Sequence, residues 1–221
     1  LRAACAAQAA PPVLIGYSMG GRLALYTALR FPHTAGGLVV IGADPGIEED
    51  AARAERLTRD EALARQLAAA GDENAFAGWL RRWYAAPLFG GLPRRADFDT
   101  LLRRRLRGRP ASLAAALRGL SAAVQPVLWE ALPRLPVPAL FIAGAEDTKY
   151  RGVADRIATL GAPWQSAVCP HAAHAAHIEQ PRAVAGLVRW FALSVAAGRR
   201  GPAAVLHSHQ ERPLLTRGAG C

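Results

Sequence analysis

Apolar residues occur along the chain in two patterns: short runs rich in Val, Ile and Leu, and longer segments with helical spacing. Near-continuous apolar runs are typical of buried strands in a parallel sheet, because helices cover both faces of such a sheet. Helical segments at 20–30, 150–160 and 181–196 follow or separate these runs. The strands predicted from the runs are 13–15, 37–42, 137–144 and 165–169.

Between residues 45 and 133 the strand pattern disappears and charged helical segments take its place. The helices predicted there are 47–70, 73–85, 98–107 and 112–123. The chain is therefore predicted to have an α/β fold with an inserted helical cap; a separate helical domain is the alternative. The predicted parts are a first core segment at 1–44, the cap at 45–133, a second core segment at 134–197 and a disordered tail at 198–221.

Composition supports a globular protein, since 52% of the 221 residues are hydrophobic and 20% are charged. No apolar stretch reaches the roughly 18 residues of a membrane span. The net charge of +10 comes almost entirely from arginine, with Lys149 the single lysine. We find no nucleic-acid motif with interleaved aromatic residues, so we expect a small anionic substrate and no nucleic-acid partner.

The cysteines and the first residues of the chain can carry signs of the redox compartment and of a targeting peptide. Cys5, Cys169 and Cys221 are odd in number and scattered, which favours a reducing compartment over a disulfide framework or a metal site. No signal or transit peptide follows Leu1, which is not a methionine.

The most specific motif is GYSMG at residues 16–20, directly after the first apolar run. A G-x-S-x-G sequence between a strand and a helix is a nucleophile elbow, which exposes Ser18 at the carboxyl end of the sheet. We expect Gly16 and Gly20 where the turn leaves no room for a Cβ, and the Met19 N–H facing a developing oxyanion. The alternative is an ordinary turn with a capping serine.

A serine nucleophile needs an orienting acid and a base, in the chain order Ser, Asp or Glu, His for this type of elbow. Asp147 and Glu146 both follow the strand at 137–144, where the acid belongs. We favour Asp147 because G-x-x-D after that strand resembles the pattern of the α/β-hydrolase superfamily, to which the elbow motif points.

The base must be His171, His174 or His177, in the loop after the last predicted strand. We favour His174, because Glu179 and Pro181 follow it in the H-x-x-x-x-E-x-P spacing that leads into the final helix. The flanking histidines are then solvated loop residues. Their i, i+3, i+6 spacing could suggest a metal site, but no nearby carboxylate cluster completes one, so we expect no metal.

The elbow is close to the start of the chain, whereas this fold places several strands before the nucleophile. We therefore expect the N-terminal strands of the domain to be missing from this chain. The second oxyanion donor, which this fold takes from the loop after its third strand, would be missing with them.

Four stretches point to one family: IGYSMGGRLALYTALRF at 15–31, WYAAPLF at 83–89, GLSAAVQPVLWEAL at 119–132 and GAEDTKY at 144–150. From about residue 12 to 191 the chain resembles the 2-succinyl-6-hydroxy-2,4-cyclohexadiene-1-carboxylate synthases of the α/β-hydrolase superfamily. The sequence of the elbow and of the helix after it resembles the plant and algal form, in which the synthase is the last domain of a long plastid protein. That form would be covalently continuous with upstream pathway domains and plastid-located; a bacterial form would be cytoplasmic.

The resemblance implies a carbon–oxygen lyase of menaquinone and phylloquinone biosynthesis that needs no cofactor. It would eliminate pyruvate from 2-succinyl-5-enolpyruvyl-6-hydroxy-3-cyclohexene-1-carboxylate. A serine hydrolase acting on an ester or a carbon–carbon bond is the first alternative, and an inactive fragment that binds a ligand or partner is the second.

The resemblance also assigns site residues in this sequence. It implies a triad of Ser18, Asp147 and His174. For the polyanionic substrate it implies three carboxylate-binding arginines and a set of pocket-lining aromatic residues; these are Arg22, Arg56, Arg105, Tyr17, Trp83 and Tyr84. The alternatives are a structural ion pair for Arg22, a solvated helix face for Arg56 and Arg105, and a place in the cap core for Trp83.

Overall fold

The computed structural model of the protein describes residues 2–6, 8, 10–198 and 205–207. The chain forms two compact units, one made of Leu1–Pro45 together with Leu128–Cys221 and the other of Gly46–Val127. We call the first the sheet unit and the second the helical unit. In sequence the helical unit is therefore an insertion between two segments of the sheet unit.

The sheet unit is built on one five-stranded sheet, in which all paired strands run parallel in the order β1-β2-β3-β4-β5. β2 and β3 are neighbours although the helical unit separates them in the sequence, with Val39 beside Leu140. The carboxyl ends of the strands therefore share one edge, where the side chains that follow them can meet. The strands are β1 (Val13–Tyr17), β2 (Gly37–Ile41), β3 (Ala139–Gly144), β4 (Trp164–Cys169) and β5 (Val205–His207).

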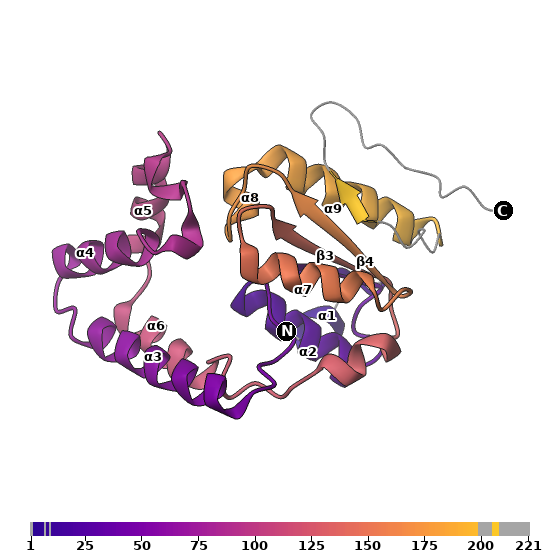
Figure 1. Cartoon of the computed structure of the whole chain (residues 1–221), viewed down its shortest axis with the longest axis horizontal. Coiled ribbons are helices and arrows are strands. Elements are labelled where there is room, and N and C mark those ends of the chain that lie inside the picture. The colour runs from indigo at the N-terminus through magenta and orange to yellow at the C-terminus, as the bar shows by residue number, and fades with distance from the viewer. Residues whose placement is uncertain (1, 7, 9, 199–204, 208–221) are drawn as a thin grey trace. The chain divides into compact units, whose positions relative to one another are not determined.

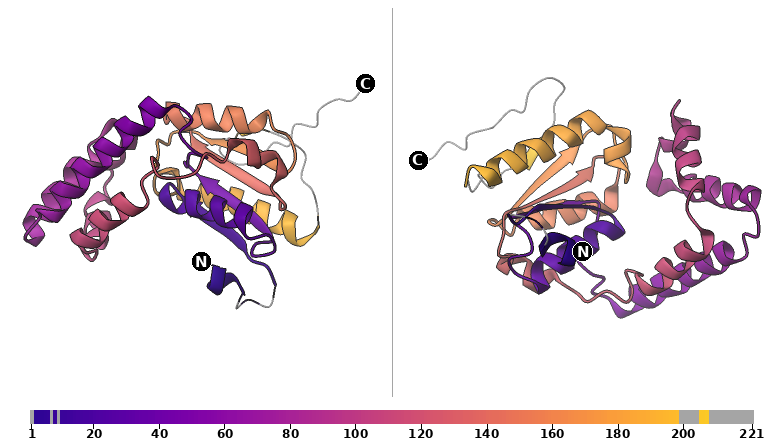
Figure 2. Two further views of the ribbon diagram at one scale, coloured as in Figure 1. Left: turned by 90° about the horizontal axis from the view of Figure 1, so that it is seen from below. Right: turned by 180° about the vertical axis from the view of Figure 1, so that it is seen from behind.

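Helices cover both faces of this sheet, as Figures 1 and 2 show, with α9 on one side and α2 and α7 on the other. Successive strand residues point to opposite faces. Val40 therefore packs in one core with Leu25 of α2 and Ala154 of α7, whereas Val39 packs in the other with Phe191 of α9. The helices of this unit are α1 (Arg2–Ala6), α2 (Met19–Arg30), η3 (Trp129–Arg134), α7 (Thr148–Ala158), α8 (Ala176–Glu179) and α9 (Pro181–Ala196).

In the helical unit α3 packs against α6, and α4 packs against α5. An aromatic cluster lies at the contact between α4 and α5. The Trp79 and Trp83 rings stack with their centroids 5.5 Å apart, and the Tyr84 ring makes edge-to-face contacts with Phe89 and Phe98. Among the described helices of both units, none has the length and apolar character of a membrane span. The elements are α3 (Asp50–Ala68), α4 (Glu73–Tyr84), η1 (Pro87–Phe89), η2 (Leu92–Arg94), α5 (Phe98–Leu106) and α6 (Pro110–Gly119).

The strands predicted at 13–15, 37–42, 137–144 and 165–169 form as β1 to β4 with small shifts at their ends. Two other predictions need correction. The helix predicted over 112–123 ends at Gly119, because Ser121 accepts the N–H of Ala123 at 3.1 Å and holds a turn instead. Within the predicted disordered tail, Val205–His207 pairs with β4 as β5, while 199–204 and 208–221 lie outside the described residues.

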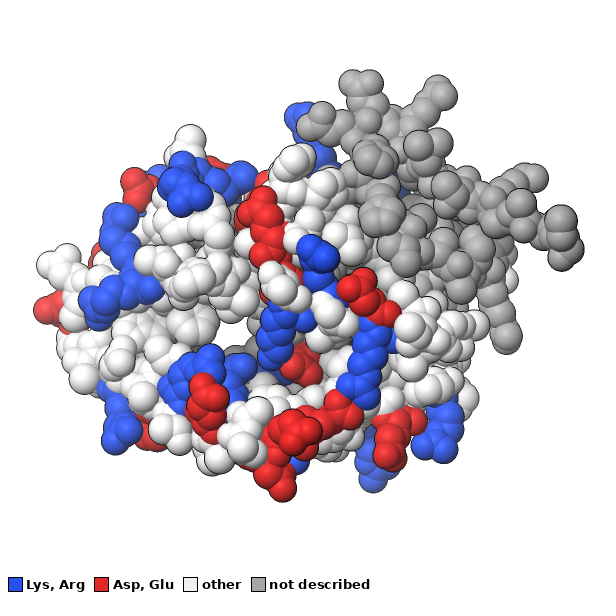
Figure 3. Space-filling view, in the orientation of Figure 1, with Lys and Arg blue, Asp and Glu red and all other residues white. Residues whose placement is uncertain are grey.

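Several arginines of the helical unit pair with carboxylates of the same unit. Arg118 binds Glu61 through Nε at 2.8 Å and Nη2 at 3.0 Å, and Arg95 binds Asp97 in the same way at 2.9 and 3.0 Å. Each arginine lowers the pKa of its partner carboxyl, chiefly through these hydrogen bonds. Acidic and basic side chains are interleaved on the surface that Figure 3 shows.

Candidate active site

The elbow predicted from GYSMG forms where β1 turns into α2. Ser18 has φ 50° and ψ −116°, a conformation that non-glycine residues rarely adopt and that is typical of a nucleophile held on a tight turn. Its N–H donates to the carbonyl of Ile41 at 2.8 Å, and its carbonyl accepts the N–H of Arg22 at 3.0 Å. Both bonds hold the strained serine in place between strand and helix.

The glycine requirement at the elbow is only partly as predicted. A Cβ on Gly16 would collide with the carbonyl oxygen of Gly20 and the Cα of Gly21, so only glycine fits there. The expectation for Gly20 is wrong, because a Cβ at that position would meet open space. The crowded second glycine is Gly21, whose Cβ would lie 2.7 Å from that of Ala43, because α2 packs closely on β2 and the residues that follow it.

Asp147 follows β3 and caps α7, so one carboxylate serves both the helix and the site. Its Oδ1 accepts the N–H of Tyr150 at 3.3 Å, and its Oδ2 lies 2.9 Å from Nδ1 of His174. The helix cap fixes the carboxylate, which is 5% exposed. Glu146, the competing acid of the sequence analysis, is exposed instead.

His174 joins the acid to the serine. Its Nε2 lies 3.1 Å from Oγ of Ser18, and its ring is 4% exposed between the rings of Tyr17 at 5.1 Å and Tyr150 at 4.8 Å. The other loop histidines do not take this place. His177 packs on Tyr17 at 4.3 Å, and His171 is exposed.

The His174 loop is held from two sides. Glu179 of α8 accepts the N–H of Ala173 through Oε2 at 3.1 Å, a buried bond directly before the histidine. From the β3 side, Glu146 N–H donates to the carbonyl of Ala172 at 2.9 Å. A Cβ on Gly144 would collide with the carbonyl oxygens of Ala172 and Ala173, so the close approach of the two loops needs glycine.

This arrangement can move a proton. Carboxylate oxygens accept hydrogen bonds, so with Asp147 Oδ2 beside Nδ1 the ring proton lies on Nδ1, and Nε2 accepts the Ser18 hydroxyl. Met19 is the first residue of α2, where backbone N–H groups lack a partner within the helix. The structure therefore places Ser18 at the amino end of α2, beside a histidine that can accept its proton and so make it more reactive.

The remaining candidates divide between the units. Arg22 is half-buried one turn after Ser18 in the sheet unit. In the helical unit, Arg105 donates through Nε to the Tyr84 hydroxyl at 3.0 Å, so two residues assigned by resemblance contact each other. Arg56 binds the buried Asp60, and Trp83 is half-buried in the aromatic cluster. Arg56 is half-buried and Arg105 is exposed, and each makes a side-chain contact within the helical unit.

Comparison with known proteins gives the family. Residues 1–187 match the alpha/beta hydrolase family. The chain belongs to the alpha/beta hydrolase family. The α/β-hydrolase fold predicted from the sequence is confirmed, because the solved structure of MenH from S. aureus superposes with a TM-score of 0.76. That match has 31% identity and covers 83% of this chain and 68% of that one. A thermophilic esterase from Thermogutta terrifontis, at 24% identity and a TM-score of 0.64, shares the fold.

Within this hydrolase family the predicted resemblance is also confirmed. The chain is 35% identical to the putative 2-succinyl-6-hydroxy-2,4-cyclohexadiene-1-carboxylate synthase of Bacillus subtilis and 34% identical to that synthase of Enterobacter sp.. It is 33% identical to the chloroplastic protein PHYLLO of Arabidopsis thaliana. These matches cover 82%, 78% and 80% of this chain, which spans 66%, 63% and 11% of the respective relatives.

Two residues of the site were not predicted from the sequence. The first is Tyr150, whose N–H holds Asp147 and whose ring packs on His174. Its position three residues after an N-capping aspartate was the available signal, because an N-cap side chain binds the N–H at that spacing. Glu179 was used as a spacing marker, although its carboxylate holds the loop itself.

Proposed function

We propose that this chain carries the catalytic groups of a 2-succinyl-6-hydroxy-2,4-cyclohexadiene-1-carboxylate synthase. Two observations together carry the proposal. His174 contacts both Ser18 and Asp147 at hydrogen-bond distance, and relatives of the chain are named as this synthase. The relatives match over about four fifths of this chain, and so include both units. A serine hydrolase would explain the contacts among Ser18, His174 and Asp147, but it would not explain why the similarity to these synthases extends into the helical unit.

The proposed reaction eliminates pyruvate from 2-succinyl-5-enolpyruvyl-6-hydroxy-3-cyclohexene-1-carboxylate. His174 Nε2 accepts the Ser18 hydroxyl proton, and Asp147 stabilises the imidazolium that forms. The serine oxygen removes the proton from ring carbon 2, which bears the succinyl group. The electrons of that C–H bond form a C2–C3 double bond, the C3–C4 double bond moves to C4–C5, and the C–O bond to the enolpyruvyl group at C5 breaks. The group leaves as enolpyruvate, which takes up the proton held by His174 and becomes pyruvate, so that Ser18 and His174 return to their starting states. The Met19 N–H stabilises negative charge that develops on oxygen.

The substrate is a polyanion, and arginine binds carboxylates with paired N–H groups. We assign carboxylate binding to Arg22, Arg56 and Arg105, and the lining of the pocket to Tyr17, Trp83 and Tyr84. The bond between Arg105 and the Tyr84 hydroxyl supports a shared role for these two. Each assignment follows the resemblance, and the helical unit is proposed as the cap that carries four of these residues.

The biological setting is proposed from the relatives. The protein would be plastid-located if it comes from a plant or alga, as PHYLLO is named chloroplastic, and cytoplasmic if it comes from a bacterium. In the plant form the chain would be continuous with other pathway domains.

The test is pyruvate release from the cyclohexene substrate by the natural protein that contains these residues. Ser18→Ala should lower turnover at least about a hundredfold, the lower range for loss of acid–base catalysis. An intact protein that releases no pyruvate would reject the proposal. A stable acyl group on Ser18 after incubation with an activated ester, detected by mass, together with ester turnover, would favour the serine hydrolase instead.

A further inference from the structure

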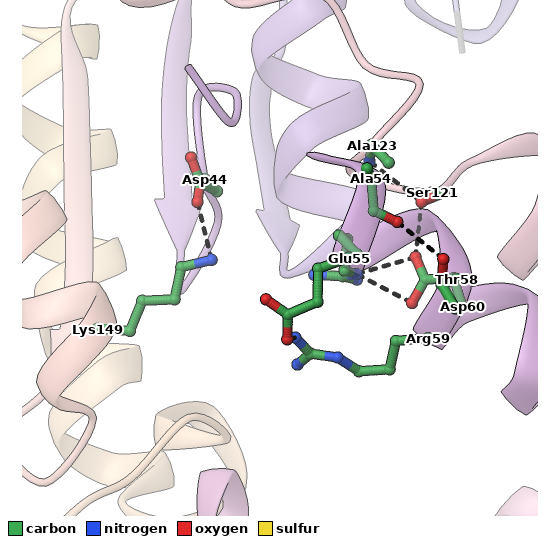
Figure 4. Close-up of polar contacts among 10 residues, drawn as sticks. Asp44, Ala54, Glu55, Thr58, Arg59, Asp60, Ser121, Ala123 and Lys149 are labelled. Atoms are coloured by element: carbon green, nitrogen blue, oxygen red, sulfur yellow. Dashed lines mark hydrogen bonds and ion pairs between the residues drawn. The ribbon is translucent and has the colours of Figure 1, made fainter. Parts of the chain in front are cut away.

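A buried polar network lies in the helical unit, where α3 meets the turn after α6 (Figure 4). Its centre is Asp60, which is buried. Ser121 donates its hydroxyl to Asp60 Oδ2 at 2.7 Å, and Arg56 donates Nε–H to both carboxylate oxygens at 2.9 Å. A buried carboxylate needs such partners, because its desolvation is costly.

The contact between Arg56 and Asp60 differs from the exposed arginine pairs of the same unit. Arg118 gives both Nε and Nη2 to its carboxylate partner. Arg56 gives Nε alone, and among the described residues it makes no other hydrogen bond or ion pair. Its side chain is 28% exposed, compared with 4% for Asp60.

A guanidinium held through Nε keeps its two terminal amino groups for another ligand. Those groups lie side by side in one plane, and they match the two oxygens of a carboxylate. Since Asp60 is anchored by Ser121, the plane and direction of the Arg56 guanidinium are set before any ligand arrives. Preorganised binding groups lose less conformational freedom when a ligand binds.

We propose that Asp60 and Ser121 are positioning residues, which orient Arg56 for end-on binding of a substrate carboxylate. The inference rests on the proposed function for the identity of the substrate. It also explains why a serine stands in the stretch GLSAAVQP at 119–126: the Ser121 oxygen ends α6 by accepting the Ala123 N–H and anchors Asp60 with its proton.

The experiment titrates the protein with succinate, a carboxylate probe that needs no turnover, and follows binding by calorimetry. Asp60→Asn should weaken succinate binding roughly tenfold, since the charge that holds Nε is lost. Ser121→Ala should weaken binding in the same direction by a smaller factor. Arg118→Ala is the matched control, because it removes a different ion pair of α3, the one that joins Glu61 to α6, and should leave binding unchanged.

A double-mutant cycle separates positioning from a merely structural role. Arg56→Ala should weaken binding, and adding Asp60→Asn to it should cause no further loss, because Asp60 acts through Arg56. If Asp60→Asn does not fold, Ser121→Ala decides, since it keeps the ion pair. Wild-type affinity in Ser121→Ala and Asp60→Asn, or no succinate binding by the wild-type protein, would overturn the inference. Expected succinate results without pyruvate release would reject the proposed function and leave the positioning role standing.

Discussion

Removing the Glu179 carboxylate tests how the base of the active site is held. The carboxylate is 9% exposed and accepts the buried N–H of Ala173 at 3.1 Å. Glu179→Ala leaves that N–H without this acceptor, at a cost of about 1–3 kcal/mol. The loop can reduce this cost by moving, and any movement carries His174 with it.

The consequence for chemistry follows from two short distances. His174 must stay 3.1 Å from Ser18 Oγ and 2.9 Å from Asp147 Oδ2 at the same time. A misplacement of about 1 Å can cost roughly a hundredfold in rate. We therefore expect Glu179→Ala to slow the reaction of Ser18 by about ten- to a hundredfold.

Two further variants make the comparison specific. Glu179→Gln keeps an oxygen that can accept the Ala173 N–H, so most of the reactivity should return. Gln180→Ala removes a neighbouring but exposed bond to the same loop, from Nε2 to the carbonyl of His171 at 3.1 Å, and should have little effect.

The assay is the rate at which a fluorophosphonate labels Ser18, because this reagent reports serine reactivity without the natural substrate. Urea unfolding of each variant gives the folded fraction, by which the rate is corrected. If Glu179→Ala labels as fast as Gln180→Ala after that correction, Glu179 does not position His174 and the argument fails.

Two more substitutions probe the site with the same measurements. His174→Ala should lower Ser18 labelling at least about a hundredfold, as for loss of a general base, while His171→Ala, at an exposed position, should label normally; equal losses would contradict the assignment of the base. Gly16→Ala should lower the urea midpoint strongly because its Cβ would collide with backbone, whereas Gly20→Ala should be tolerated. A Gly20→Ala variant as unstable as Gly16→Ala would show that the elbow packs differently.

Local pattern was enough to predict the framework of this protein. Buried parallel strands carry their signal in their own residues, so β1 to β4 were placed with small errors at the ends. The elbow motif and the spacing after β3 and β4 selected Ser18, Asp147 and His174, which the structure brings into hydrogen-bond contact. Because the carboxyl ends of parallel strands share one edge, residues that follow different strands could be expected to meet.

Tertiary structure decided what depends on contacts between distant segments. Ser121 binds Asp60 across 61 positions, and this contact holds the buried carboxylate with the same hydroxyl that accepts the Ala123 N–H beyond the end of α6. The crowding at Gly21 rather than Gly20 comes from Val40 of β2 and from Ala43, which follows that strand. The role of Glu179 depends on how α8 folds back on the loop before it. Helical spacing and sequence motifs each describe one segment of the chain. The contacts of Ser121, Gly21 and Glu179 form only when separate segments pack together, so these patterns could not predict them.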